Sequence, residues 1–234
     1  MSPFRPASDP LFTTTHWSVV LSARDDDDRD ALEMLCRSYW RSLYVMARRF
    51  GQAPHDAEDL VQGFFAKLLS RDWLRAAGPE RGRFRTFLSV TFRRYMADEY
   101  DHATRQKRGG GATMLSLDRE NAECFYAGEL STIETPEHAF DKAWALDVVA
   151  AAQARLRRES ATAGKEALFD AISAGEPYAE IGTRLGLSVS AITSAAFRMR
   201  RRCEEIIREE IARTVADPGE VEEEIAHLLA VLRG

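Results

Sequence analysis

Apolar residues recur at intervals of three and four along most of this 234-residue chain, and that spacing restricts the possible folds more than any other feature. It is the spacing of one side of an α-helix, whereas a half-buried strand alternates apolar and polar residues. Residues 29–51 are the clearest example, and Gly51 follows where a left-handed residue commonly ends a helix. The apolar positions of this stretch are Leu32, Leu35, Tyr39, Leu43 and Met46. Runs of β-branched residues are absent, so the sequence predicts an all-α protein.

The same spacing predicts further helices, separated by glycines, prolines and one weakly patterned segment. They are expected over residues 54–74, 81–108, 136–159, 164–173, 177–186, 188–215 and 220–233. Three consecutive glycines at 109–111 and the unpatterned residues after them predict a linker. The expected parts are an N-terminal segment over 1–30, a helical domain over 31–108, a linker over 109–135, a second helical domain over 136–202 and an acidic helical extension over 203–234.

The composition fits a globular protein, because hydrophobic residues make up 45% of the chain. Cys36, Cys124 and Cys203 lie far apart and form no Cys/His pair at metal-ligand spacing, which favours reduced thiols. The sequence has neither the apolar core of a signal peptide nor an apolar run near the roughly 20 residues of a membrane span. We expect a cytoplasmic protein with no membrane partner.

Charge is unevenly distributed along the chain, whose formal net charge is −5. Residues 81–108 contain eight Arg and Lys against three Asp and Glu, whereas residues 203–234 contain nine Asp and Glu against three Arg. An acidic protein has no general attraction for phosphate. A basic middle and an acidic end therefore indicate charge that is placed for particular partners.

Residues 177–202 fit a helix-turn-helix, in which two helices meet at a tight turn. Gly186 can take the positive φ of the turn, and Ser188 can cap the second helix. The inward side of that helix carries Ile192, Ala196, Met199 and Cys203. Its outward side carries Ser190, Thr193, Ser194, Phe197, Arg198 and Arg201. An ordinary αα-hairpin remains the alternative for this segment.

The second helix of this motif is better suited to holding DNA than to reading its sequence. Recognition helices read bases near their N-terminal end, and residues 189–196 carry no positive charge. The arginines that follow are Arg198, Arg200, Arg201 and Arg202. They can contact phosphates, and Phe197 can contact a thymine methyl group. We expect this helix alone to bind DNA poorly.

Aromatic residues are interspersed with arginines in residues 81–108, and two interpretations are open. Rings that stack on bases, beside guanidinium groups that hold the backbone, suit single-stranded nucleic acid. Phe87, Leu88 and Phe92 can equally belong to a core, with the arginines on a solvated face. The duplex-binding candidate elsewhere in the chain favours a protein that opens a promoter, because opening needs contacts to unpaired and to paired DNA.

Three segments, in this order and spacing, resemble the extracytoplasmic-function sigma factors of bacterial RNA polymerase. Residues 56–69, DAEDLVQGFFAKLL, resemble the part that docks on the clamp helices of the polymerase β′ subunit. Residues 82–108, GRFRTFLSVTFRRYMADEYDHATRQKR, resemble the helix that melts and recognises the −10 element. Residues 178–202, YAEIGTRLGLSVSAITSAAFRMRRR, resemble the helix-turn-helix that binds the −35 element.

The resemblance implies two all-α domains and assigns roles to particular residues. Core RNA polymerase would bind Asp56, Glu58, Asp59 and Gln62. The −10 strand would lie along Phe84, Arg85, Phe87, Arg93, Arg94, Tyr95, His102 and Arg105. The −35 duplex would face Ser190, Thr193, Ser194, Phe197, Arg198 and Arg201. Thr193 stands where common members carry Lys, and those members also carry an Arg near the position of Ala195, so −35 readout is expected to differ here or to be weak.

The implied partners are core RNA polymerase, through its β′ clamp helices, and promoter DNA. Polymerase would supply most of the affinity for DNA, so the net negative charge of this subunit would not prevent promoter binding. An anti-sigma factor, a regulatory kinase and the acidic extension are the candidates for controlling its activity. We expect the extension to fold on the second domain, or to shield that domain's basic face until polymerase binds.

Other function classes fit the sequence less well. The histidines are dispersed, and residues 163–165, AGK, lack the earlier glycine and the following Ser or Thr of a P-loop. We expect no catalytic residue, no metal site and no cofactor. A stand-alone helix-turn-helix regulator and a sigma-like protein that binds only other proteins remain the alternatives.

Overall fold

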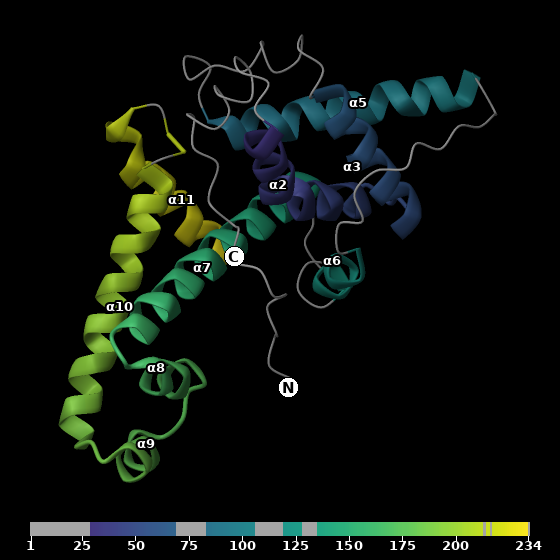
Figure 1. The fold of residues 1–234 in the computed structure, drawn as a ribbon. Coiled ribbons are helices and arrows are strands. Elements are labelled where there is room, and N and C mark those ends of the chain that lie inside the picture. Colours follow the sequence, from purple (N-terminus) through teal and green to yellow (C-terminus); the bar gives the residue numbers. More distant parts are fainter. Residues whose placement is uncertain are drawn as a thin grey trace.

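All regular elements in the described part of the chain are helices (Figure 1). The structure, a computed structural model, describes residues 29–68, 83–105, 119–127, 135–212, 214–215 and 217–233. The helices are α2 (Arg29–Arg49), α3 (Pro54–Leu68), α5 (Phe84–Arg105), α6 (Arg119–Phe125), α7 (Pro136–Thr162), α8 (Glu166–Ser173), α9 (Tyr178–Leu185), α10 (Val189–Ala212) and α11 (Val221–Arg233), with a 3-10 turn over Pro218–Glu220. The predicted all-α class is confirmed. The expected N-terminal segment lies outside the described residues up to position 28, as does most of the expected linker.

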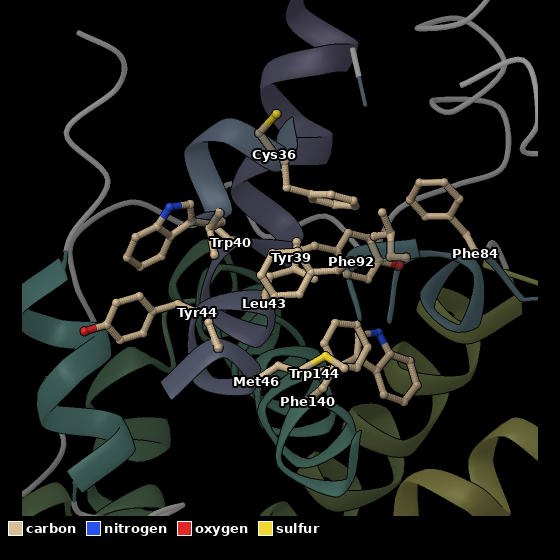
Figure 2. Close-up of a cluster of buried hydrophobic side chains, with 14 of the residues drawn as sticks. Cys36, Tyr39, Trp40, Leu43, Tyr44, Met46, Phe84, Phe92, Phe140 and Trp144 are labelled. Carbon is tan, nitrogen blue, oxygen red and sulfur yellow. The ribbon is translucent and has the colours of Figure 1, made fainter. Parts of the chain in front are cut away.

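The main core is built around α2, whose apolar side chains between Cys36 and Ala47 are buried. Figure 2 shows the aromatic side chains that gather there from several helices. Tyr39 lies edge-on to Phe84 of α5, with ring centroids 5.6 Å apart, and stacks on Phe140 of α7 at 6.5 Å. Phe64 of α3 meets Phe92 of α5 at 5.0 Å. Large buried rings of this kind dominate the energy of a core, so they fix how these four helices pack.

The helix α7 packs directly on α2 and shares its core. Phe140, Trp144, Ala145 and Val148 of α7 are buried in the same cluster as the aromatic residues of α2 and α5. A buried ion pair between Arg41 of α2 and Asp147 of α7 lies beside this contact. The helix expected to begin a second domain is thus part of the core of the first.

A short helix, α6, lies within the segment expected to be a linker. Glu123 accepts hydrogen bonds from Tyr44 at 2.6 Å and from Arg48 at 2.8 and 2.7 Å. The guanidinium of Arg41 lies 4.2 Å above the centre of the Phe125 ring. Seven residues are too few to show a helical period in the sequence, and these contacts to α2 hold the helix in place.

The acidic extension ends in α11, which closes one side of the core. Its residues Val221, Leu228 and Val231 are buried in the main cluster, together with Val215 before it. The helix contacts both α7 and α10. These contacts agree with the expectation that the extension folds on the second domain. The expectation did not include the burial of α11 residues in the core that α2 and α5 share.

The helices α8 and α9 and the start of α10 form the opposite end of the molecule from α3 and α5 (Figure 1). A small cluster of Ala171, Ile181 and Ile192 joins them, and Phe169 packs against α7 and α10 through Leu156 and Ile206. Within the part of the chain that the structure describes, no helix has the length and apolar character needed to cross a membrane.

Candidate nucleic-acid and polymerase interfaces

The acidic residues at the start of α3 form an outward-facing surface. Ala57, Val61 and Phe64 bury the opposite side of the helix in the core. Of the residues expected to bind polymerase, Asp56 and Asp59 are exposed, whereas Glu58 and Gln62 are half-buried and lie 3.4 Å apart. Carboxylates in the first turn also complement the positive end of the helix dipole, so this surface is compatible with a stable helix.

Two aromatic residues of α5 that the sequence places along the −10 strand are buried instead. Phe84 is 2% exposed and Tyr95 is 6% exposed. The Tyr95 ring packs on Phe64, and its hydroxyl lies where a side chain on Gly63 of α3 would begin. Burial, with a smaller contribution from Glu99, raises the pKa of Tyr95 to about 12. In this conformation both rings hold α5 on the core. Phe87 is half-buried and stacks on Phe84, with ring centroids 5.9 Å apart, so it also packs α5 on the core.

Arg85, also expected along the −10 strand, lies in a buried ion-pair network. Its Nε donates to Glu224 of α11 at 2.6 Å, and its Nη1 donates to Asp141 of α7 at 2.5 Å. The guanidinium also lies 4.9 Å from the centre of the Trp144 ring. Burial alone would lower the pKa of Arg85, but the hydrogen bond to Glu224 and the charges of Asp141 and Glu224 raise it. This arginine is therefore charged and fully engaged within the protein.

The other basic residues of α5 differ in their exposure. Arg83, just before the helix, lies 2.9 Å from Glu224, and Arg93 forms an exposed ion pair with Glu137 of α7 at 3.2 Å. Arg94 is exposed. His102 and Arg105 belong to the last turns of α5, and their side chains lie outside the described residues.

The α9–α10 unit has the turn that the sequence predicts. Gly186 has φ of 67°, in the left-handed region, and ends α9. The Ser188 hydroxyl accepts a hydrogen bond from the backbone N–H of Ala191 at 3.1 Å, so the predicted cap of α10 is confirmed. Ile192 and Ala196 are buried, as expected for the inward side.

The outward side of α10 carries all six residues expected at the −35 duplex. Ser190, Thr193, Ser194, Phe197, Arg198 and Arg201 are exposed. Phe197 is 61% exposed, an unusual position for a large apolar ring on a soluble surface. The Thr193 hydroxyl donates to the backbone oxygen of Val189 at 2.9 Å, within its own helix.

Arg202, which the sequence groups with the phosphate-binding arginines, is half-buried and paired with carboxylates of the protein itself. It donates to both oxygens of Glu159 on α7, at 2.9 and 3.0 Å, and to Glu209 at 3.0 Å. These hydrogen bonds raise its pKa, Glu159 contributing most. Arg202 therefore joins α10 to α7, and Arg198, Arg200 and Arg201 are the exposed arginines at this end of α10.

The helices α2, α3 and α5 coincide with a known domain. Residues 35–108 match the family model for sigma-70 region 2. This part of the chain is a sigma-70 region 2 domain. A region 2 domain supports a sigma factor's role in binding RNA polymerase and melting promoter DNA. We found no significant match among curated proteins or solved structures.

Two carboxylates that the sequence analysis did not single out form ion pairs with the region 2 helix α5. Glu224 is 1% exposed and lies 139 positions from its partner Arg85, and Asp141 lies 56 positions from it. The signal available in the sequence was the acidic character of the extension, which does not specify a partner. In the described residues, no group of three or more His, Cys, Asp or Glu side chains is arranged to hold a metal ion.

Proposed function

We propose that this protein is a sigma factor of the extracytoplasmic-function type, which binds core RNA polymerase through α3 and directs it to promoters. The observation that carries the proposal is the region 2 match over residues 35–108, which includes the acidic start of α3. Exposed carboxylates such as Asp56 and Asp59 suit basic clamp helices of the polymerase β′ subunit. On this proposal the protein acts in the cytoplasm, without a catalytic residue or cofactor of its own.

In the same proposal the α9–α10 unit binds the −35 duplex as a helix-turn-helix. The capped, left-handed turn and the exposed outward side of α10 support this assignment. Arg198 and Arg201 contact phosphates, and Phe197 contacts a thymine methyl group. Ser190 and Ser194 lie at the end of the helix that reads bases. Residues 189–196 carry no positive charge, so the affinity of α10 itself for DNA is modest, and polymerase contributes most of the affinity of the complex for the promoter.

Co-purification with core RNA polymerase tests the proposal directly. We expect the wild-type chain to bind in a one-to-one ratio and the Asp56→Ala/Asp59→Ala variant to bind several-fold less, because both carboxylates are exposed and neither supports the core. A matched control is Glu166→Ala/Glu180→Ala, which removes two exposed carboxylates at the far end of the molecule. Equal retention of all three proteins would reject the assignment of α3 as the docking surface. Absence of binding by the wild type at low salt would leave a stand-alone regulator or a protein-only adaptor.

A further inference from the structure

Four carboxylates from the C-terminal half of the chain face the beginning of α5, and we call them the acidic cover. They are Glu137 and Asp141 of α7 and Glu223 and Glu224 of α11. Figure 1 shows the start of α5 on the side of the molecule where α11 lies. Each carboxylate pairs with an arginine that precedes or belongs to the region 2 helix α5.

The centre of this contact is buried. The Arg85 side chain is 8% exposed and that of Glu224 is 1% exposed, and two N–H groups of Arg85 reach the two oxygens of Glu224 at 2.6 and 3.2 Å. Such two-pronged pairing of a guanidinium with a carboxylate is strong and directional. Asp141 occupies the remaining side of the same guanidinium at 2.5 Å. Solvent and other anions are therefore excluded from Arg85 in this conformation.

The edge of the contact is solvent-accessible and involves two more arginines. Arg83 lies 2.9 Å from Glu224 and 3.5 Å from Glu223. Arg93, two turns further along α5 than Arg85, lies 3.2 Å from Glu137. The cover thus engages a row of arginines on one side of α5. A phosphate binds a guanidinium by the same charge and geometry as a carboxylate, so a guanidinium group that is paired with the cover is less able to bind a phosphate.

We propose that the acidic cover keeps the free protein in a closed conformation in which Arg85 is buried and Arg83 and Arg93 are paired with carboxylates, so that DNA binds this side of α5 weakly, and that binding to polymerase and promoter opens it. The proposal deepens the proposed function, because it states how the acidic extension regulates the region 2 helix. It differs from the sequence-based expectation that the extension shields the second domain, since the residues it covers belong to α5.

The test compares two full-length variants that carry the same change in charge. The cover variant is Glu137→Gln/Glu223→Gln/Glu224→Gln, in which each amide keeps the shape of the acid it replaces. The control variant is Glu166→Gln/Glu204→Gln/Glu222→Gln, in exposed residues that do not face α5. The Glu222 change is the closest match, because this residue is on α11 but pairs with Arg208 of α10.

Two measurements on the free proteins are decisive. The first is the affinity for a short fluorescein-labelled single-stranded oligonucleotide, which we expect to be about tenfold higher for the cover variant than for the control. The second is the radius of gyration from small-angle X-ray scattering, which we expect to be larger for the cover variant. Equal affinity and equal size for the two variants would overturn the proposal. If circular dichroism shows that the cover variant is unfolded, Glu137→Gln/Glu223→Gln, which leaves the buried Glu224 intact, replaces it with the same criteria.

These measurements separate the closed conformation from the proposed function. Neither requires polymerase, so an open, tighter-binding cover variant supports closure even if no variant co-purifies with core enzyme. Conversely, polymerase binding by the wild type together with identical size and DNA affinity of the two variants would retain the sigma assignment and reject the cover.

Discussion

Two glycines of the α9–α10 unit are required for different physical reasons. Gly186 has φ of 67°, which costs a residue with a Cβ atom roughly 1–2 kcal/mol, although nothing would obstruct the Cβ itself. Gly182 has ordinary helical geometry, but a Cβ there would lie 2.6 Å from the backbone oxygen of Leu187. That contact is with backbone rather than with a flexible side chain, so the turn itself would have to move.

We predict that Gly182→Ala destabilises the protein although alanine is the better helix former. Helical propensity favours the change by about 1 kcal/mol, whereas overpacking typically costs about 1–3 kcal/mol and shifts the turn that orients α10. Urea unfolding measures the free energy of unfolding. The control is Thr183→Ala, at an exposed neighbouring position, which should change it by less than about 0.5 kcal/mol. A more stable Gly182→Ala protein would show that the turn accommodates the methyl group.

The two glycines also show which features of a single residue could be predicted from the sequence and which could not. Gly186 was predictable, because a glycine after an amphipathic stretch commonly ends a helix. The need for glycine at position 182 arises from the approach of Leu187, which depends on the angle between α9 and α10. The same limit applies to Phe84 and Tyr95: their aromatic character was visible, but the side of α5 that faces the core was not, because rings serve a core and a nucleic-acid surface equally well.

At the scale of an element, α6 illustrates a helix that exists through its contacts. Arg48 and Tyr44 hydrogen-bond Glu123, and they lower the pKa of its carboxyl, Arg48 contributing most. A carboxyl whose pKa is lower in the folded than in the unfolded protein stabilises the fold above its ordinary pKa of 4.5. That stabilisation is lost as the pH falls through the lower, folded value, when the acid takes up a proton.

We predict that Glu123→Gln lowers the free energy of unfolding at pH 7 by about 1 kcal/mol. This is less than a fully buried charged hydrogen bond contributes, because solvent partly screens the Arg48–Glu123 pair. The difference from wild type should shrink as the pH falls below 4.5, because the unfolded wild-type chain then takes up the proton first, and it should vanish below the lower, folded pKa, where Glu123 is neutral in both states. Urea unfolding at a series of pH values measures this, with the exposed Asp98→Asn as the control. A difference that stays constant down to about pH 3 would mean that the charge of Glu123 is not the cause.

Among the elements, periodicity predicted the long helices well and their assembly poorly. The ranges 29–51, 136–159 and 220–233 each correspond to an observed helix whose ends lie within three residues of the predicted ones. A local pattern indicates that a helix has an apolar side, but not which helix covers it. The helices α2, α7 and α11 share one core through contacts between residues that are far apart in the sequence. Neither the apolar periodicity nor the glycines of the expected linker could indicate these contacts.

At the scale of the whole molecule, the charge distribution and the shared core act together. The net charge of −5 opposes DNA binding by the free protein, and pairing of Arg83, Arg85 and Arg93 within the molecule opposes it further. Apolar residues of α11 and α7 hold the carboxylates that make these pairs in position. On the proposed closure, stability of the core and access of DNA to α5 are therefore coupled through these two helices.

Because α11 is part of the main core, we predict that damage to it lowers the stability of the entire described structure rather than of its last helix alone. Leu228 is 1% exposed and its neighbour Leu229 is 44% exposed, so they form a matched pair on one helix. Leu228→Ala should cost about 2–5 kcal/mol, and Leu229→Ala less than about 0.5 kcal/mol. Unfolding in urea is followed by far-ultraviolet circular dichroism, which reports all helices, and by fluorescence of tryptophans that include Trp40 and Trp144 in the core.

In the Leu228→Ala protein both signals should shift together to lower urea and remain a single transition, since one cooperative unit has one free energy of unfolding. The alternative is an extension that detaches by itself. In that case circular dichroism would show a small early loss of helix, while the fluorescence transition stayed at its wild-type midpoint. That outcome would separate α11 from the core energetically, and it would also weaken the coupling between core stability and the closure of α5.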